Sequence, residues 1–190
     1  MNIDLSWDLF VVVFFVVIVA YSFIIGRDNT LKVILGTYVA MIAADAGGNL
    51  FADYFSGSAV FVKLLDFASV GNEQEAVVFV KLAIFVVMVI LFAVKGAFEV
   101  DTVDDRSALI RLVLSVVYAV LSAGLIISTI LVFISGVSLV SGGDFAQGNA
   151  LWGIYDSSEF VRSIINNSHL WFSLPALSFL IHSLYTHKEQ

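Results

Sequence analysis

The ionisable side chains best placed to do chemistry in this sequence are Asp45 and Lys81, because each lies inside a long run of apolar residues. A charged carboxylate at the centre of a membrane costs about 2.5 to 3.5 kcal/mol on insertion scales, so such a group has to be sheltered, paired or protonated. Lys81 lies within about two helical turns of the depth of Asp45. We therefore take the two residues as a candidate intramembrane polar pair.

Other interpretations of these two residues stay open. Asp45 could instead accept a hydrogen bond from Thr37, Tyr38 or a serine of the apolar run that begins at residue 108, and Lys81 could extend toward the interface. A proton or ion pathway is a further hypothesis, because intramembrane carboxylates often mark one. Such pathways usually need a chain of polar groups, and residues 82–94 offer none. The sequence therefore favours a structural role for Asp45.

The other residue types that catalyse reactions or bind metals lack the spacing that such sites require. The three histidines show no metal-ligand spacing, and cysteine is absent. The sequence also contains no nucleophile elbow, phosphate-binding loop or His-Glu-x-x-His motif. The sequence predicts a protein that is not an enzyme and that carries no metal and no cofactor.

The composition predicts that most of the chain lies in a membrane. Apolar residues make up 60% of the 190 residues and charged residues only 13%, and the mean hydropathy is +1.00. A soluble chain of this length would expose such long apolar runs on its surface. The formal net charge of −7 argues against nucleic acid as a partner, because phosphate binding needs clustered Lys and Arg. Membrane lipids are the expected surroundings.

Five apolar runs approach or exceed the length of about 20 residues that crosses a bilayer. They cover residues 9–25, 33–54, 76–94, 108–140 and 169–185, approximately. The last run is shorter and contains Pro175, so it is either a fifth span or a re-entrant segment. The predicted fold is all-α: a polytopic helical membrane protein with four core transmembrane helices and this C-terminal segment, forming one domain over residues 1–190.

Two connecting stretches have the spacing of short amphipathic helices at the membrane interface. Apolar side chains in residues 58–70 share the face opposite Lys63 and Asp66. Apolar side chains in residues 157–167 follow Asp156, which we take as the cap of that helix. Loops with chance periodicity are the alternative.

The positions of Lys and Arg predict the orientation, because cytoplasmic loops retain these residues. With five spans and an external amino terminus, six basic residues face the cytoplasm and three face outward. If the last run does not cross, the counts become five and four, so the bias favours five spans. We expect a multi-pass protein of the inner (plasma) membrane with its amino terminus outside.

Small residues recur every four positions along the second apolar run and form one face of a helix. They are Gly36, Ala40, Ala44 and Gly48. Such a groove lets the backbone of another helix approach closely, which favours association in lipid. The run 108–140 repeats the spacing with Ser115, Ala119 and Ala123 and is the partner that we expect. A second copy of residues 33–54 is the competing partner, and small residues that are merely common in spans are the third interpretation.

Two short motifs flank the core spans. Gly26 and Arg27 follow the first span in "FIIGRDNTLK", and Asp105 with Arg106 precedes the fourth span. Together with the small-residue second span and the polar stretch "SSEFVRSIINNSHLWFSLP", they resemble the colicin V production protein family of small polytopic bacterial inner-membrane proteins. The resemblance implies a role in toxin production or export, or in envelope maintenance, without a catalytic site.

These observations favour a noncatalytic integral membrane protein of the cell envelope. It would act through helix packing, either with a membrane protein partner or with itself as a homo-oligomer. The alternative hypothesis is a small channel or transporter subunit that uses Asp45 as an intramembrane titratable group.

Overall fold

A computed structural model describes residues 7–55, 58, 63, 73–96, 108–136 and 158–186 of the chain. The longer described segments fold into helices, and none of the described residues is in a strand, which confirms the predicted all-α fold. The helices are α1 (Trp7–Ile25), α2 (Arg27–Phe55), α4 (Glu73–Lys95), α5 (Ala108–Ile134), α7 (Glu159–Asn166) and α8 (Ser168–Thr186).

Four of these helices, α1, α2, α4 and α5, are long and apolar enough to cross a membrane. The 29 residues of α2 extend over about 44 Å, at about 1.5 Å per residue, which exceeds the hydrocarbon thickness of about 30 Å. The apolar part of α8, Ser168–Ile181, is shorter than a typical span. The chain is therefore a multi-pass helical protein whose core elements match the four predicted spans.

Two predicted boundaries differ from the structure. Helix α2 begins at Arg27 rather than near residue 33, because its first turn consists of polar residues that an apolar pattern cannot detect. Helix α5 ends at Ile134 rather than near residue 140. Gly136 follows it with φ of 74°, and its N–H donates to the Phe133 carbonyl at 3.0 Å, so the end of the helix is capped by a glycine in the left-handed region.

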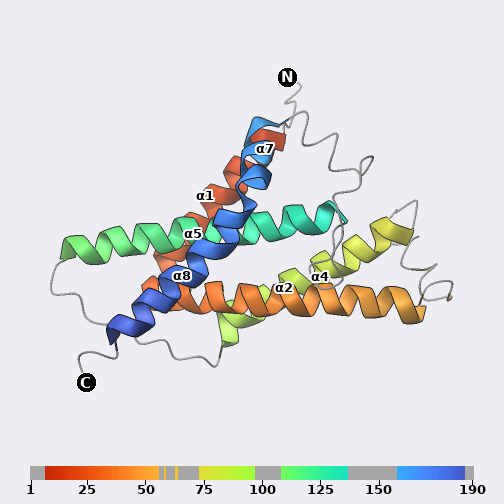
Figure 1. Ribbon diagram of the computed structural model, residues 1–190, viewed down its shortest axis with the longest axis horizontal. Coiled ribbons are helices and arrows are strands. Elements are labelled where there is room, and N and C mark those ends of the chain that lie inside the picture. The colour runs from red at the N-terminus through yellow and green to blue at the C-terminus, as the bar shows by residue number, and fades with distance from the viewer. Residues whose placement is uncertain are drawn as a thin grey trace.

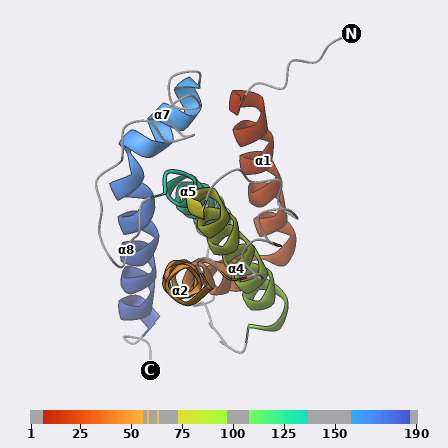
Figure 2. The same ribbon diagram turned by 90° about the vertical axis from the view of Figure 1, so that its right-hand side faces the viewer.

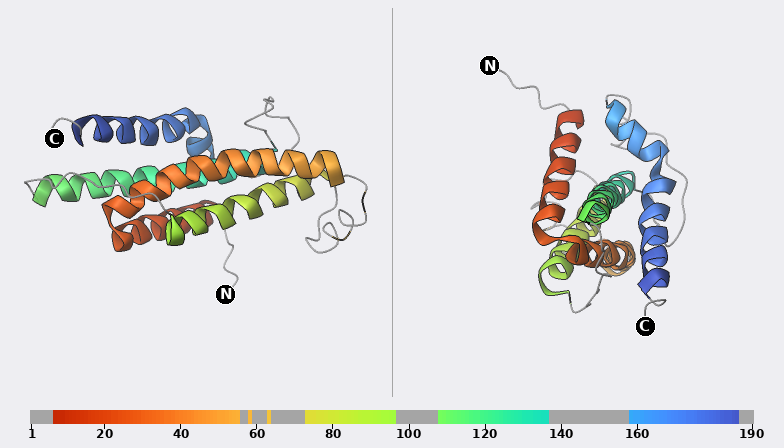
Figure 3. Two further views of the ribbon diagram at one scale, coloured as in Figure 1. Left: turned by 90° about the horizontal axis from the view of Figure 1, so that it is seen from below. Right: turned by 90° about the vertical axis from the view of Figure 1, so that its left-hand side faces the viewer.

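Helix α5 lies at the centre of the bundle. Figure 1 shows α2 and α5 running in the same direction, with α4 antiparallel to α2. Helices α1 and α8 lie on opposite sides of the α2 and α5 pair, as Figure 2 and the right-hand view of Figure 3 show. Within the apolar window of α5, 78% of the residues are buried, against 11% for α1 and for α4. The outer helices therefore carry most of the surface that faces lipid.

A tight corner joins α1 to α2. Gly26 has φ of 82°, and its N–H donates to the Ser22 carbonyl at 3.1 Å. The Thr30 hydroxyl lies 2.8 Å from the Gly26 carbonyl and 3.1 Å from the Ser22 carbonyl, so it joins the two helix ends. A side chain at position 26 would strain the backbone, because residues other than glycine rarely adopt this conformation.

The short helix α7 corresponds to the amphipathic helix predicted at residues 157–167. Its N-cap is Ser158, whose hydroxyl accepts the Val161 N–H at 3.1 Å, so the predicted cap at Asp156 is corrected. The carboxylate of Asp8 accepts the Phe160 N–H at 3.1 Å and the Ser158 hydroxyl. The start of α7 is thereby attached to the start of α1, a link that no local pattern indicates.

The helix predicted at residues 58–70 lies outside the described residues, apart from Ser58 and Lys63.

Candidate functional site

Asp45 of α2 and Lys81 of α4 form a buried ion pair. The Lys81 Nζ lies 2.6 Å from the Asp45 Oδ1, and the exposed fractions of the two residues are 4% and 0%. Removing two charges from water is costly, and a short hydrogen-bonded contact offsets that cost. The Thr37 and Tyr38 hydroxyls, the alternative partners, donate instead to the carbonyls of Val33 and Phe172.

The glycines of α2 make room for the lysine side chain. A Cβ added to Gly48 would lie 2.3 Å from the Lys81 Cγ, so the stem of Lys81 lies directly against the α2 backbone. At Gly47 the nearest atom would be the Cδ1 of Ile84 at 3.0 Å, at the tip of a flexible side chain. Gly48 therefore determines how closely the ammonium group approaches Asp45.

The small-residue face of α2 packs mainly on α4. A Cβ on Gly36 would lie 2.5 Å from the Phe92 Cβ, so both ends of the groove are filled by side chains of α4. Ala40 and Ala44 are fully buried in a cluster that includes Phe85 of α4, together with Phe133 of α5. The expectation that residues 108–140 pack on this face holds in part, because Phe133 of α5 shares the cluster of Ala40 and Ala44, but α4 supplies the side chains that pack against the glycines.

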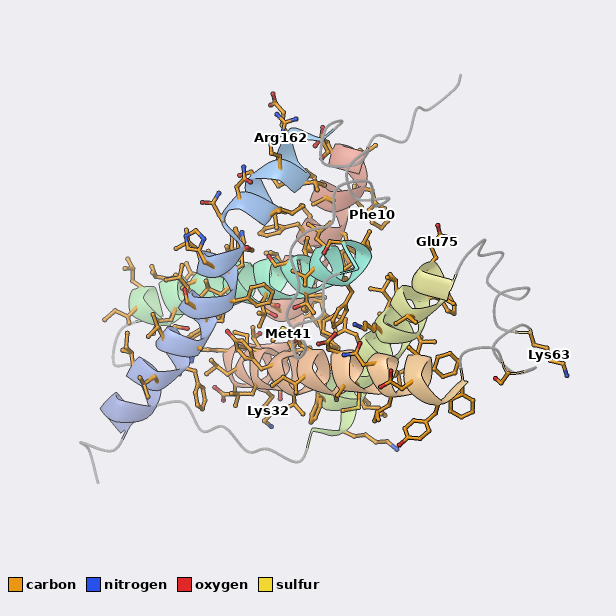
Figure 4. The ribbon with its side chains drawn as sticks, turned by 45° about the vertical axis from the view of Figure 1, so that its right-hand side comes forward. Phe10, Lys32, Met41, Lys63, Glu75 and Arg162 are labelled. Atoms are coloured by element: carbon orange, nitrogen blue, oxygen red, sulfur yellow. The ribbon has the colours of Figure 1, made fainter. Side chains whose placement is uncertain are left out.

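Helix α5 contacts α2 through larger side chains. Leu125 and Tyr118 of α5 pack with Leu31 and Ile34 of α2, and the Thr129 hydroxyl lies 3.8 Å from the Met41 sulfur. Figure 4 shows Met41 on the side of α2 that faces the interior of the bundle. The contact between Met41 and Thr129 of α5 therefore lies one helical turn from Asp45, which pairs with α4.

The small residues predicted on α5 have other surroundings. Ala119 and Ala123 are fully buried, whereas Ser115 is half-buried and its hydroxyl donates to the Arg111 carbonyl of its own helix at 2.8 Å. The glycine of α5 that receives a large side chain is Gly124. A Cβ there would lie 2.0 Å from the ring of Trp171, so the Trp171 ring of α8 packs directly against the α5 backbone at Gly124.

Tyr38 links α2 to α8 and was not identified as a contact between those helices from the sequence. Its hydroxyl donates to the Phe172 carbonyl at 2.6 Å. Phe172 lies in the turn of α8 before Pro175, but the helical hydrogen bond that Pro175 cannot donate would have gone to the Trp171 carbonyl, so the proline does not free the carbonyl that Tyr38 contacts. A polar tyrosine within an apolar run is the sequence signal of this contact.

The family-like loop residues are only partly described. Gly26 and Arg27 form the corner between α1 and α2, where the Arg27 side chain is 8% exposed and its Nε lies 3.9 Å from the Asp28 carboxylate. Asp105 and Arg106 lie outside the described residues. No protein-family model, curated protein or solved structure matches the chain.

The ion pair allows two kinds of chemistry. As two opposite charges in surroundings of low polarity, Asp45 and Lys81 attract each other strongly and join α2 to α4. As a carboxylate in contact with an ammonium group, they could also exchange a proton. Within the described helices, no group of three or more His, Cys, Asp or Glu side chains gathers as a metal site would require.

Proposed function

We propose that this chain is a noncatalytic multi-pass membrane protein of the cell envelope that acts through helix packing with a partner protein or with a second copy of itself. The observation that carries the proposal is the placement of Asp45 and Lys81, which are buried between α2 and α4 and paired at 2.6 Å. Their charges are used inside the fold, where they hold one helix against another.

The outer helices offer the surface for such an association. Large apolar side chains of α1 and α4 are exposed, among them Val16 and Val17 of α1 and Val87 and Ile90 of α4. Lipid covers such a surface in a monomer, and another membrane helix can replace the lipid. The resemblance to the colicin V production protein family favours a role in toxin production or export, or in envelope maintenance, in an inner membrane.

Photo-cross-linking in native membranes tests this proposal. A photoreactive amino acid at Val17 or Ile90 is expected to give discrete protein adducts, either with a second copy or with a partner, whereas the same group at buried Leu31 is expected to give none. Adducts with lipid alone at several positions of α1 and α4 would contradict the proposal.

A second candidate function is a small channel or transporter subunit in which Asp45 titrates. The observation in its favour is the ion pair itself, since intramembrane ionisable groups often lie on proton or ion routes. Proton flux in proteoliposomes, compared between the native protein and Asp45→Asn, separates the two candidates. A flux that Asp45→Asn abolishes, and that Asp53→Asn at the exposed end of α2 leaves intact, supports transport. Equal leak in all three proteins supports the role in helix packing.

A further inference from the structure

A small cavity lies where α5, α7 and α8 meet. Its volume is about 10 Å³, and its lining consists of Ser128, Leu131, Val132, Ile164, Ile165 and Ser168. A volume of about 10 to 15 Å³ is the least that holds one water molecule. Among the described residues, the space therefore fits a single water molecule.

One lining residue carries a hydroxyl that has no partner within the described structure. Ser128 is 1% exposed, and its Oγ makes no hydrogen bond to a described residue. Most buried polar atoms in proteins are hydrogen-bonded to protein or to ordered water, and a buried hydroxyl left alone is unfavourable. An unpaired hydroxyl beside a water-sized cavity thus indicates what fills the cavity.

We propose that this cavity binds one water molecule, which bridges the hydroxyls of Ser128 in α5 and Ser168 in α8. Buried waters generally contact at least two polar groups, and these two side chains supply them from two helices. The bridge lies at the joint between α7 and α8, where Asn166 ends one helix and Ser168 begins the next. The water thereby connects α5 to the point where α7 meets α8. Figure 2 shows the arrangement of these three helices.

Ser122 provides a matched control on the same helix. It is fully buried and its Oγ also has no partner among the described residues, but it does not line this cavity. Removing the Ser122 hydroxyl removes an unsatisfied group, whereas removing the Ser128 hydroxyl also removes a water ligand. Alanine is therefore expected to lower stability at position 128 but not at position 122.

Thermal unfolding of the purified protein in detergent tests the proposal. Ser128→Ala is expected to lower the unfolding midpoint by about 2 to 4 °C, and Ser122→Ala is expected to leave it unchanged or to raise it. Adding Ser168→Ala to Ser128→Ala should lower it little further, because both hydroxyls hold the same water. A Ser128→Ala midpoint equal to or above that of the native protein would overturn the proposal, as would fully additive effects of the two substitutions.

Radiolytic hydroxyl-radical footprinting provides a readout that does not depend on unfolding. A bound water generates radicals in place, so Val132 and Ile164 are expected to be modified several-fold faster than Ile126 and Val33, which are equally buried elsewhere in the bundle. Ser128→Ala should remove the difference. Equal rates at the two pairs in the native protein would show a dry cavity.

Discussion

Gly48 shows how a residue without a side chain controls a charge. The stem of Lys81 occupies the space that a Cβ at position 48 would take, so Gly48→Ala has to displace Lys81 from Asp45. We expect a loss of about 1 to 3 kcal/mol in unfolding free energy, which is typical of overpacking. Denaturation in mild detergent measures it.

Gly47→Ala is the matched control, because its Cβ would meet only the tip of Ile84. Alanine favours a helix over glycine by about 0.5 to 1 kcal/mol, and the close contact with the Ile84 side chain opposes this gain. We therefore expect Gly47→Ala to be close to neutral. Equal losses at positions 47 and 48 would show that Lys81 is not seated on Gly48.

The hydrogen bond that the Tyr38 hydroxyl donates is a second contact, and removing one oxygen atom tests it. Tyr38→Phe removes the hydrogen bond to the Phe172 carbonyl while keeping the ring. We expect a loss of about 0.5 to 1.5 kcal/mol, together with faster amide exchange or proteolysis in α8, because the bond attaches α8 to α2. Tyr21→Phe, at an exposed position on α1, is the control. If α8 of the Tyr38→Phe variant is as well protected from amide exchange and proteolysis as α8 of the native protein, this role is contradicted.

At this scale, the pairing of Asp45 with Lys81 could be inferred because two charges in apolar runs at similar depths have few other partners. The apolar side chains that fill the glycine positions, Phe92 and Trp171, could not be inferred. The sequence contains 17 phenylalanines and 3 tryptophans, and their pattern does not distinguish the side chain that enters a groove from those that face lipid.

Among the elements, the pairing of α2 with α4 is the main departure from expectation. Small residues at four-residue spacing occur in both α2 and α5, and the spacing alone indicates close packing without naming the partner. The partner is decided by side chains on the opposing helix, where Lys81 and Phe92 of α4 fill the glycine positions of α2. The presence of the four long helices, in contrast, was predictable because bilayer thickness sets a minimum apolar length, whereas the start of α2 and the end of α5 were not.

Disulfide formation in native membranes tests the α2 and α4 packing. The chain has no cysteine, so Gly36→Cys with Phe92→Cys introduces one defined pair. The Cβ positions are 2.5 Å apart with phenylalanine present, and a disulfide needs about 3.5 to 4.5 Å, so a small separation suffices. We expect rapid cross-linking on mild oxidation within one chain. Gly36→Cys with Ile90→Cys, whose side chain is 55% exposed on α4, should remain reduced.

For the whole molecule, the direction of α8 bears on the number of crossings. Figure 1 and Figure 2 show α8 running in the same direction as α1, from the end that carries α7 toward the end where α2 begins. This direction agrees with the five-span arrangement that the Lys and Arg counts favour. Composition predicted the membrane class, but the sequence left the last segment open, because Pro175 fits either a kinked span or a re-entrant helix.

Impermeant thiol labelling in intact cells determines that topology. Single cysteines at Asn29 and Lys95 are expected to be protected from outside, and a cysteine at Glu75 is expected to react, because these exposed positions lie at opposite ends of the spans. A cysteine added at the C-terminus should be protected like the one at Asn29 if α8 crosses the membrane. Its reaction from outside would restrict the protein to four crossings.

The central claim is that Asp45 and Lys81 hold α2 against α4 as a buried pair, and a double-mutant cycle measures this directly. Asp45→Asn or Lys81→Met alone should cost about 3 to 5 kcal/mol of unfolding free energy, because each removes one charge of the buried pair and leaves the other without the opposite charge that it contacts. The double variant should lose at least about 1 kcal/mol less than the sum of the two. Additive losses, with no coupling energy between positions 45 and 81, would contradict the account.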